Sequence, residues 1–312
     1  MIPSRAEISA ARTRIAPHIR LTPVLTLEAG ALGLPFALDF KLEHTQLTGS
    51  FKVRGAFNTL LGARVPEAGV VAISGGNHGA AVAHAATTLG HKSTIFVPAT
   101  IAQEVKLARM RAFGAEVIVA DGTVAEVIAR YEAHAAETGA LPVHPYDTPP
   151  TVIGQGTVAA EIEAQLPHLD TLMVAVGGGG LIGGVASWFG DQVRIVSVET
   201  EGTNTLARSL AEGPEIDVRA TGVAAGSLGG PALGRLPWEV VRSRVATALV
   251  LSDATVFEAG HRLWEAARLS VEPGAAVALA ALTSGAYVPQ RDERVGVLLC
   301  GGNAEPGWWA GK

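Results

Sequence analysis

The sequence predicts an α/β protein built on mostly parallel sheets. Short runs rich in valine and isoleucine alternate with segments of helical period through most of the 312 residues, which is typical of βα units around a parallel sheet. Glycine clusters follow three of the predicted strands, at residues 75–79, 177–180 and 301–302. Because the loops after parallel strands meet at one edge of the sheet, where ligands bind, we expect a site there.

The first predicted elements follow from local patterns. Ser4 and Glu7 have capping-box spacing, which indicates a helix over residues 4–16. Residues 36–42 alternate apolar and polar side chains, which predicts a strand with one face in solvent. Three βα units come next, with strands at 70–73, 93–97 and 116–120 and helices at 77–89, 101–113 and 123–137.

A proline-rich segment separates these units from the rest of the chain. Residues 141–150 contain four prolines, which favours a connection between packed units. Beyond this segment, the pattern of residues 233–247 does not distinguish a helix from a strand. The remaining pattern predicts helices at 152–166, 181–189, 253–268 and 274–284 and strands at 171–176, 193–199 and 294–299.

Composition excludes several classes of protein. The net charge is −5 and the 24 basic residues are scattered, so no basic surface for nucleic acid or anionic lipid is predicted. The uncharged stretch 171–190 contains seven glycines, which argues against a membrane-spanning helix. The N-terminus lacks a signal-peptide pattern, and Cys300, the single cysteine, cannot form an intrachain disulfide. We expect a cytoplasmic protein.

The tetraglycine segment 177–180 predicts an anion site. Glycine has no side chain to keep a ligand from the main chain, so a glycine loop leading into a helix can direct several amides and the helix dipole at a phosphate. Residues 178–183 also match G-x-G-x-x-G, and Glu199 ends the next strand about 20 residues on, as in dinucleotide sites. An NAD-dependent oxidoreductase therefore stays open at this point.

Lys52 points to a different chemistry. It follows Phe51 and precedes a small-residue helical run, which indicates partial burial. Burial lowers the pKa of an amine towards the neutral nucleophile that a Schiff base requires. An ordinary lysine at a helix start would give the same local pattern.

Four strings taken together resemble one enzyme family. SFKVRGA, SGGNHG, GGGGL and LLCGGN, in this order and spacing, are similar to motifs of the fold type II pyridoxal-phosphate enzymes, and among them to the threonine/serine dehydratase and serine racemase group. The resemblance implies a tryptophan synthase β-like fold of two three-layer αβα domains, pyridoxal 5'-phosphate as cofactor, and a homodimer or higher homo-oligomer. We place a large cofactor-binding domain at 1–65 and 148–312 and a small mobile domain at 66–147.

The resemblance also implies roles for single residues. Lys52 would hold the cofactor and act as the catalytic residue, with Phe51 against the ring. Asn77 would donate to the phenolic oxygen, Cys300 would face the pyridine nitrogen as an uncharged partner, and Glu272 would lie near the ring. The phosphate would lie on Gly177, Gly178, Gly179, Gly180 and Leu181. Substrate-binding positions would be Ser50, Ser74, Gly75, Gly76 and His78.

The implied activity is that of a lyase of amino-acid metabolism. Lys52 would remove the α-proton of a 3-hydroxy amino acid and the β-hydroxyl would leave as water. L-Threonine would give 2-oxobutanoate and ammonia, and L-serine, as second substrate, pyruvate. A serine racemase or a hydroxyaspartate dehydratase on the same fold stays an alternative, as do a β-replacement synthase and a non-catalytic ligand-binding protein.

Three positions depart from the pattern of the group. Gly75 stands where serine racemases place a serine that acts as second base, so racemisation is disfavoured. The divalent-cation site of that subgroup would fall on Glu199 and the residues near Thr203 and Thr205, where threonine replaces an aspartate, so we expect no metal. Gly226 stands where relatives often carry an acidic residue, which leaves the side-chain specificity open.

Overall fold

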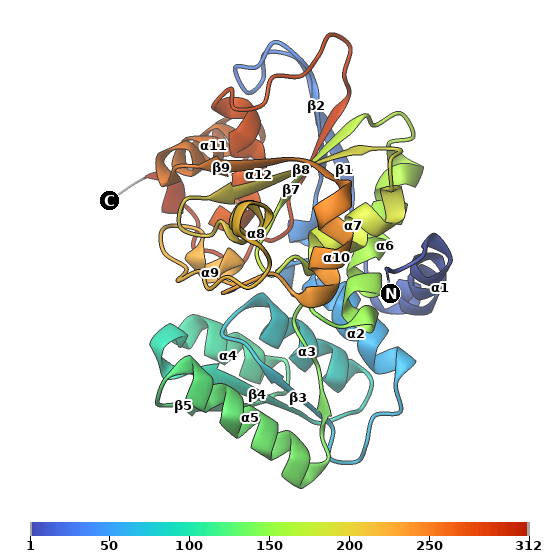
Figure 1. Ribbon diagram of the computed structural model, residues 1–312, viewed down its shortest axis with the longest axis vertical. Coiled ribbons are helices and arrows are strands. Elements are labelled where there is room, and N and C mark those ends of the chain that lie inside the picture. Colours follow the sequence, from blue (N-terminus) through green and yellow to red (C-terminus); the bar gives the residue numbers. More distant parts are fainter. Residues whose placement is uncertain (1, 311–312) are drawn as a thin grey trace.

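The computed structural model describes residues 2–310 and contains two sheets, both mostly parallel (Figure 1). The six-stranded sheet has the order β1-β2-β10-β7-β8-β9. Only the β1–β2 pair in it is antiparallel. Its strands are β1 (Val24–Leu27), β2 (Leu38–Lys41), β7 (Thr171–Ala175), β8 (Arg194–Thr200), β9 (Val245–Leu251) and β10 (Val295–Leu298). The α/β class with mostly parallel sheets is therefore confirmed.

The four-stranded sheet has the order β5-β4-β3-β6 and is parallel throughout. Its strands are β3 (Val70–Ile73), β4 (Ser93–Pro98), β5 (Glu116–Ala120) and β6 (Leu141–Pro142). Three helices accompany it, α3 (Asn77–Thr88), α4 (Glu104–Ala112) and α5 (Val124–Thr138). This group forms the lower part of Figure 1.

Alternation along the strands of the small sheet explains its two covered faces. Val70 and Ala72 of β3 belong to one buried cluster, together with the alanine-rich face of α3. Val71, the residue between them, belongs to a second cluster with Phe96 and Val127 of α5. Because successive strand side chains point to opposite faces, a continuous apolar strand needs helices on both sides.

The remaining helices accompany the six-stranded sheet or join the two groups. None of the helices among residues 2–310 combines the length and the apolar character needed to span a bilayer. They are α1 (Arg5–Ile15), α2 (Lys52–Gly62), α6 (Pro149–Gln165), α7 (Gly180–Phe189), α8 (Thr205–Glu212), α9 (Ala225–Leu228), α10 (Arg235–Arg244), α11 (Asp253–Ala267) and α12 (Pro273–Thr283).

Helix α6 lies between α2 and α7 and contacts both through glycines. A Cβ on Gly154 would lie 2.7 Å from the Cα of Gly55 in α2. A Cβ on Gly184 of α7 would lie 2.5 Å from the backbone nitrogen of Gly156. No side chain fits at such distances, so the backbones of the three helices are in direct contact. Part of the glycine content therefore serves close helix packing rather than loops.

Two sequence predictions were wrong in detail. Lys41 of strand β2 was expected on the face exposed to solvent, but its side chain is buried, with 1% of its surface exposed. The ion pair between its ammonium and the Glu161 carboxylate, at 2.7 Å, makes this burial possible. The helix expected to begin at Ile101 begins at Glu104, after a 3₁₀ turn. The undecided stretch 233–247 contains α10 and the start of β9. The capping box at Ser4 is present and confirms the first helix.

A buried network of four charges joins β2, α2 and α6. The Arg54 guanidinium lies 2.7 Å from the carboxylate of Glu43 and 2.8 Å from that of Glu161, which also accepts from Lys41. Arg54 and Glu43 are both 0% exposed. Burial disfavours the charged form of Glu43, yet Arg54, with smaller contributions from Thr22 and Lys41, holds the pKa of that carboxyl below its usual value. Arg54 thereby anchors the start of the helix that begins at Lys52.

Candidate functional site

A cavity of about 530 Å³ lies at the carboxyl ends of strands from both sheets. Its lining includes every predicted site residue except Ser50. These are Phe51, Lys52, Ser74, Gly75, Gly76, Asn77, His78, Gly177, Gly178, Gly179, Gly180, Leu181, Glu272 and Cys300. Ser50 is buried in an isolated bridge to Gly301, and its hydroxyl has no hydrogen-bond partner among residues 2–310. Two of the glycine clusters, 75–79 and 177–180, thus meet around one space with Cys300, the residue before the third cluster.

Lys52 is the first residue of α2, and its amine faces this cavity. Its Nζ donates to the Pro145 carbonyl at 2.8 Å and lies 5.2 Å from the centre of the Phe51 ring. Burial lowers the pKa of Lys52 to about 8. The amine therefore loses its proton far more readily near neutral pH than an ordinary lysine does, and the neutral amine is the form that can add to a carbonyl or accept a proton.

The tetraglycine loop lies between β7 and the N-terminus of α7. Gly179 has φ +85°, which favours glycine. A Cβ on Gly178 would lie 2.4 Å from Cδ1 of the Tyr146 ring, so Tyr146 lies directly against the loop backbone. The first amides of a helix have no partner within the helix, and together with the dipole they can bind an anion such as a phosphate.

Asn77 lies at the centre of a series of hydrogen-bonded side chains in the cavity wall. Its Nδ2 donates to both carboxylate oxygens of Glu272, at 2.8 and 3.0 Å. Its Oδ1 accepts from Asn303 Nδ2 at 2.7 Å, and Asn303 Oδ1 accepts from Arg109 of α4. Burial raises the pKa of Glu272, while the Asn77 hydrogen bond and the charge of Lys106 act in the opposite direction.

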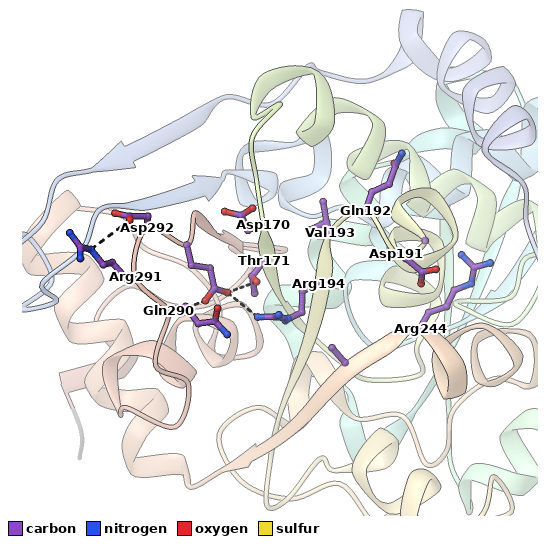
Figure 2. Close-up of a pocket in the computed structure, with 13 residues that line it drawn as sticks. Asp170, Thr171, Asp191, Gln192, Val193, Arg194, Arg244, Gln290, Arg291 and Asp292 are labelled. Atoms are coloured by element: carbon purple, nitrogen blue, oxygen red, sulfur yellow. Dashed lines mark hydrogen bonds and ion pairs between the residues drawn. The ribbon is translucent and has the colours of Figure 1, made fainter.

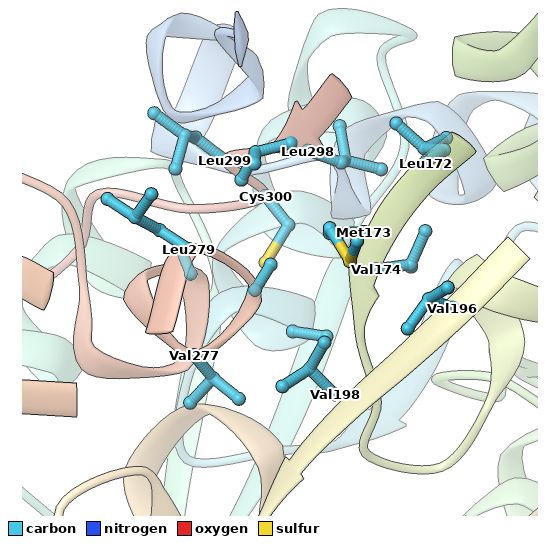
Figure 3. Packing of buried hydrophobic residues seen from close by; sticks show 14 of the residues in the cluster. Leu172, Met173, Val174, Val196, Val198, Val277, Leu279, Leu298, Leu299 and Cys300 are labelled. Carbon is cyan, nitrogen blue, oxygen red and sulfur yellow. The ribbon is translucent and has the colours of Figure 1, made fainter. Parts of the chain in front are cut away.

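Cys300 follows β10 and is 2% exposed. Figure 3 shows its sulfur with Leu279 of α12 on one side and Met173 of β7 on the other. Burial raises the pKa of the thiol above its ordinary value. Cys300 is therefore an uncharged, weak hydrogen-bonding group at neutral pH.

The loop before α3 supplies a second set of backbone amides. Ser74 Oγ accepts from the Gly76 amide at 3.2 Å. The ring Nε2 of His78 lies 2.8 Å from the Val143 carbonyl, and burial lowers the pKa of His78 to about 3. His78 is therefore neutral and links α3 to the segment after β6.

Several lining residues carry no sequence pattern that indicates a site. Tyr146 lies in the proline-rich connection, and Lys106 lies on helix α4 among other charged residues. Only the packing of the two sheets brings them to the cavity. The lining residues not predicted include Ile73, Thr100, Ile101, Gln103, Lys106, Pro145 and Tyr146.

Glu199 lies on β8 next to the tetraglycine loop. Its two carboxylate oxygens accept from the amides of Leu206 and Ala207, each at 2.8 Å, and Thr205 Oγ1 donates to it at 3.2 Å. Burial raises the pKa of Glu199 to about 7. Among residues 2–310, no three His, Cys, Asp or Glu side chains come together as a set of metal ligands.

A second cavity, of about 560 Å³, lies at the opposite edge of the large sheet (Figure 2). Asp170, Thr171 and Arg194 lie where β7 and β8 begin, with Arg291 towards one end and Arg244 towards the other. Charges there pair locally, as Arg194 does with Glu293 at 3.5 Å. No predicted site residue lines this cavity.

Known proteins match most of the chain. The family description "Pyridoxal-phosphate dependent enzyme" matches residues 15–301. A serine racemase of Oryza sativa subsp. indica is 35% identical over 309 residues, which cover 96% of this chain and 91% of that protein. A beta-hydroxyaspartate dehydratase of Paracoccus denitrificans is 33% identical and covers 97% of both chains. The crystal structure of a threonine deaminase from T.th. has a TM-score of 0.90 at 35% identity, covering 97% of this chain and 99% of that one.

The cavity fits pyridoxal phosphate on its own geometry. A loop that admits no Cβ at Gly178 leads into a helix N-terminus, an amine of lowered pKa faces the same space, and an uncharged thiol lies at its wall. The family match and the structural likeness confirm the resemblance that the four motifs indicate. The chain belongs to the pyridoxal-phosphate dependent enzymes, in the fold type II branch that contains serine racemase and threonine deaminase.

Proposed function

We propose that the protein removes water and ammonia from a 3-hydroxy amino acid, with L-threonine as first candidate and L-serine as second. The family and its dehydratase and ammonia-lyase members support a pyridoxal-phosphate-dependent lyase. The observation that carries the proposal is the shared cavity, in which the Lys52 amine of lowered pKa faces the space beside the tetraglycine loop. This arrangement suits α-proton removal from an amino acid, in which the lysine would act as base and the loop would hold the phosphate of a cofactor that accepts electrons from Cα.

Each group of residues in the cavity would have its own role in the reaction. Lys52 Nζ would hold the cofactor and then take the Cα proton. Amides of the loop 177–180 would bind the phosphate without adding charge. Bound pyridoxal phosphate supplies an electron-accepting ring that stabilises negative charge at Cα. The amides around Gly75 and Gly76, before α3, would hold the substrate carboxylate.

Asn77, Cys300 and Glu272 would orient and tune the ring. Asn77 Nδ2 donates to the Glu272 carboxylate in the cavity wall, and Asn303 fixes the orientation of the Asn77 amide by donating to its Oδ1. A neutral thiol at Cys300 would not hold a proton on the pyridine nitrogen, so the ring would be a moderate electron acceptor. This favours elimination, in which departure of the hydroxyl removes the negative charge from Cα.

Racemisation is the weaker alternative. Gly75 has no side chain to deliver a proton to the opposite face of Cα, and Ile101 Cδ1 lies 3.0 Å from where a Cβ on Gly75 would be. A larger side chain there would have to displace Ile101. An NAD-dependent reaction has no support beyond the match of residues 178–183 to its fingerprint.

We also propose that residues 66–147 move as a unit relative to 1–65 and 148–312. The four-stranded sheet and its three helices lie within the first range. The homodimer, or higher homo-oligomer, and the cytoplasmic location stay predictions from the family and the composition.

A substrate panel tests the proposed reaction. The holoenzyme is incubated with L-threonine, L-serine, D-serine and L-3-hydroxyaspartate, and ammonia and 2-oxo acid are measured separately. We expect equal amounts of both products from at least one L-amino acid and none from D-serine. Bound cofactor with no product from any of the four would overturn the proposal.

Gly178→Ala should weaken cofactor binding. The new methyl group would lie 2.4 Å from the Tyr146 ring, so the loop or the ring must shift. Overpacking of this kind costs about 1–3 kcal/mol, or roughly 5- to 150-fold in Kd. Titration of the apoenzyme with pyridoxal phosphate, followed by fluorescence, measures the effect.

Gly62→Ala is the matched control for this substitution. Gly62 is exposed at the end of α2, and a Cβ there approaches only Arg14 Nη1, at 3.9 Å. Its Kd should equal that of the unsubstituted protein. A Kd within twofold of that value for Gly178→Ala would contradict the phosphate-binding role of the loop.

A further inference from the structure

Lys106 is a half-buried cation in the cavity, and residues 2–310 supply it with no ion-pair partner. It lies on α4, and its side chain contributes to the cavity lining. None of the ion pairs or side-chain hydrogen bonds found among residues 2–310 involves Lys106, whereas Arg111 of the same helix pairs with Glu104 at 2.8 Å. Its positive charge acts on Glu272 inside the cavity. The ammonium is therefore oriented towards the site rather than towards a surface carboxylate.

Gly226 lies opposite this ammonium. A Cβ on Gly226 would lie 3.5 Å from Lys106 Nζ, in ordinary contact, and its backbone is not in the left-handed region. A side chain therefore fits at this position. An aspartate or glutamate there would reach Lys106 and neutralise it. In this chain Gly226 supplies no carboxylate to Lys106 and leaves room beside the ammonium.

We propose that Lys106 binds a carboxylate on the side chain of the substrate, so that the preferred substrate is an acidic 3-hydroxy amino acid such as L-3-hydroxyaspartate. This rests on the proposed function but changes its order of substrates, since it places an acidic 3-hydroxy amino acid ahead of L-threonine and L-serine. The α-carboxylate would lie at the amides before α3, and the second carboxylate would face Lys106 on α4. The methyl group of threonine and the hydrogen of serine gain nothing from an ammonium at this position.

The overall reaction balances without a further reactant. The Cα–H bond breaks and its proton goes to Lys52. The Cβ–O bond breaks, and the hydroxyl leaves with one proton as water. The released enamine takes up one water and loses ammonia, which gives oxaloacetate. One hydroxyaspartate thus gives one oxaloacetate and one ammonia.

The test compares kcat/KM for L-3-hydroxyaspartate with kcat/KM for L-serine, using holoenzyme. We expect the unsubstituted protein to prefer hydroxyaspartate. Lys106→Met should lower the ratio by roughly 10- to 100-fold, since hydrogen bonds to charged groups have this magnitude. Gly226→Asp, which keeps Lys106 but gives it an internal partner, should lower the ratio in the same direction.

Lys92→Met is the matched control. Lys92 is an exposed lysine between α3 and β4, outside the cavity lining, so the ratio should not change. A second readout needs no turnover. Inhibition by succinate, competitive with L-serine, should weaken by roughly 10-fold or more in Lys106→Met, whereas inhibition by butyrate, which has one carboxylate, should not.

The outcomes separate this inference from the proposed function. Loss of activity towards all four amino acids of the panel would end both. Turnover of L-serine or L-threonine with no preference for hydroxyaspartate would end only the inference. An unchanged ratio in both Lys106→Met and Gly226→Asp, with unchanged succinate inhibition, would also end it while leaving the dehydratase intact.

Discussion

Lys52→Ala should lower turnover by at least roughly 10²- to 10⁴-fold, the range that a positioned acid or base contributes. The variant has no amine in the cavity either to hold the cofactor or to take the Cα proton. We also expect it to lose the yellow absorbance of the protein-bound cofactor. Absorbance spectra after dialysis and assays of 2-oxo acid measure the two effects independently.

Lys52→Arg distinguishes the roles of charge and nucleophilicity. Arginine keeps a cation at the start of α2, but its guanidinium does not deprotonate in proteins. The pKa of Lys52 is lowered to about 8 by burial, so the native amine is available where arginine is not. The arginine variant should be as inactive as the alanine variant. Retention of more than about a tenth of the activity in either variant would show that another group removes the proton.

Arg54→Met should destabilise the fold by about 3–5 kcal/mol, the cost of removing one member of a buried charge network. The variant leaves the carboxylates of Glu43 and Glu161 without the guanidinium that holds them at 2.7 and 2.8 Å. Lys41 is then the only remaining cation of the network, and it contacts Glu161 rather than Glu43. Equilibrium unfolding in urea, followed by circular dichroism, measures the loss.

Arg242→Met is the control for Arg54→Met. Arg242 pairs with Glu239 at 2.9 Å, but both side chains are well exposed, at 53% and 49%. Exposed pairs contribute about 0–1 kcal/mol, so this variant should be nearly as stable as the unsubstituted protein. Equal losses in the two variants would show that the buried network adds nothing beyond a surface pair.

The stability loss of Arg54→Met should also depend on pH. In the unsubstituted protein the pKa of Glu43 is held below its usual value, so its ion pair contributes stability above the ordinary carboxyl pKa of 4.5 and loses it as the pH falls through the lowered value. In the variant the buried Glu43 carboxylate has no guanidinium beside it, so protonation removes an unpaired buried charge and stabilises the fold. The difference in the free energy of unfolding between the two proteins should therefore become smaller as the pH falls.

Local patterns predicted most of the elements, and they also singled out residues that prove to line one cavity. The capping box at Ser4 and the apolar runs at 70–73 and 171–175 depend on neighbouring residues alone, and the structure has elements at each. The motifs around Lys52 and the tetraglycine loop likewise depend on short spacings. These residues meet because parallel strands have their following loops at the same edge.

Long-range pairs could not be predicted. Lys41 was expected to face solvent because it is a polar residue in a strand that alternates apolar and polar side chains. Its burial instead depends on Glu161, 120 positions away, and no local pattern indicates that partner. Lys106 and Gly226 are also far apart along the chain and approach only when the two sheets pack. The contact between Arg109 and Asn303 has the same origin. A charge on a helix does not indicate which element will face it.

The glycine contacts of α6 have a consequence for how this sequence can vary over time. Helix α2 begins with Lys52, α7 begins with the tetraglycine loop, and Gly154 and Gly156 of α6 hold the two helices in direct backbone contact with it. The separation between the Lys52 amine and the tetraglycine loop therefore depends on a helix that lines none of the cavity. Substitutions in the middle of α6 should be tolerated as rarely as substitutions in the loops that line the cavity, so surveys of tolerated substitutions would find that the shape of the cavity restricts residues well outside it.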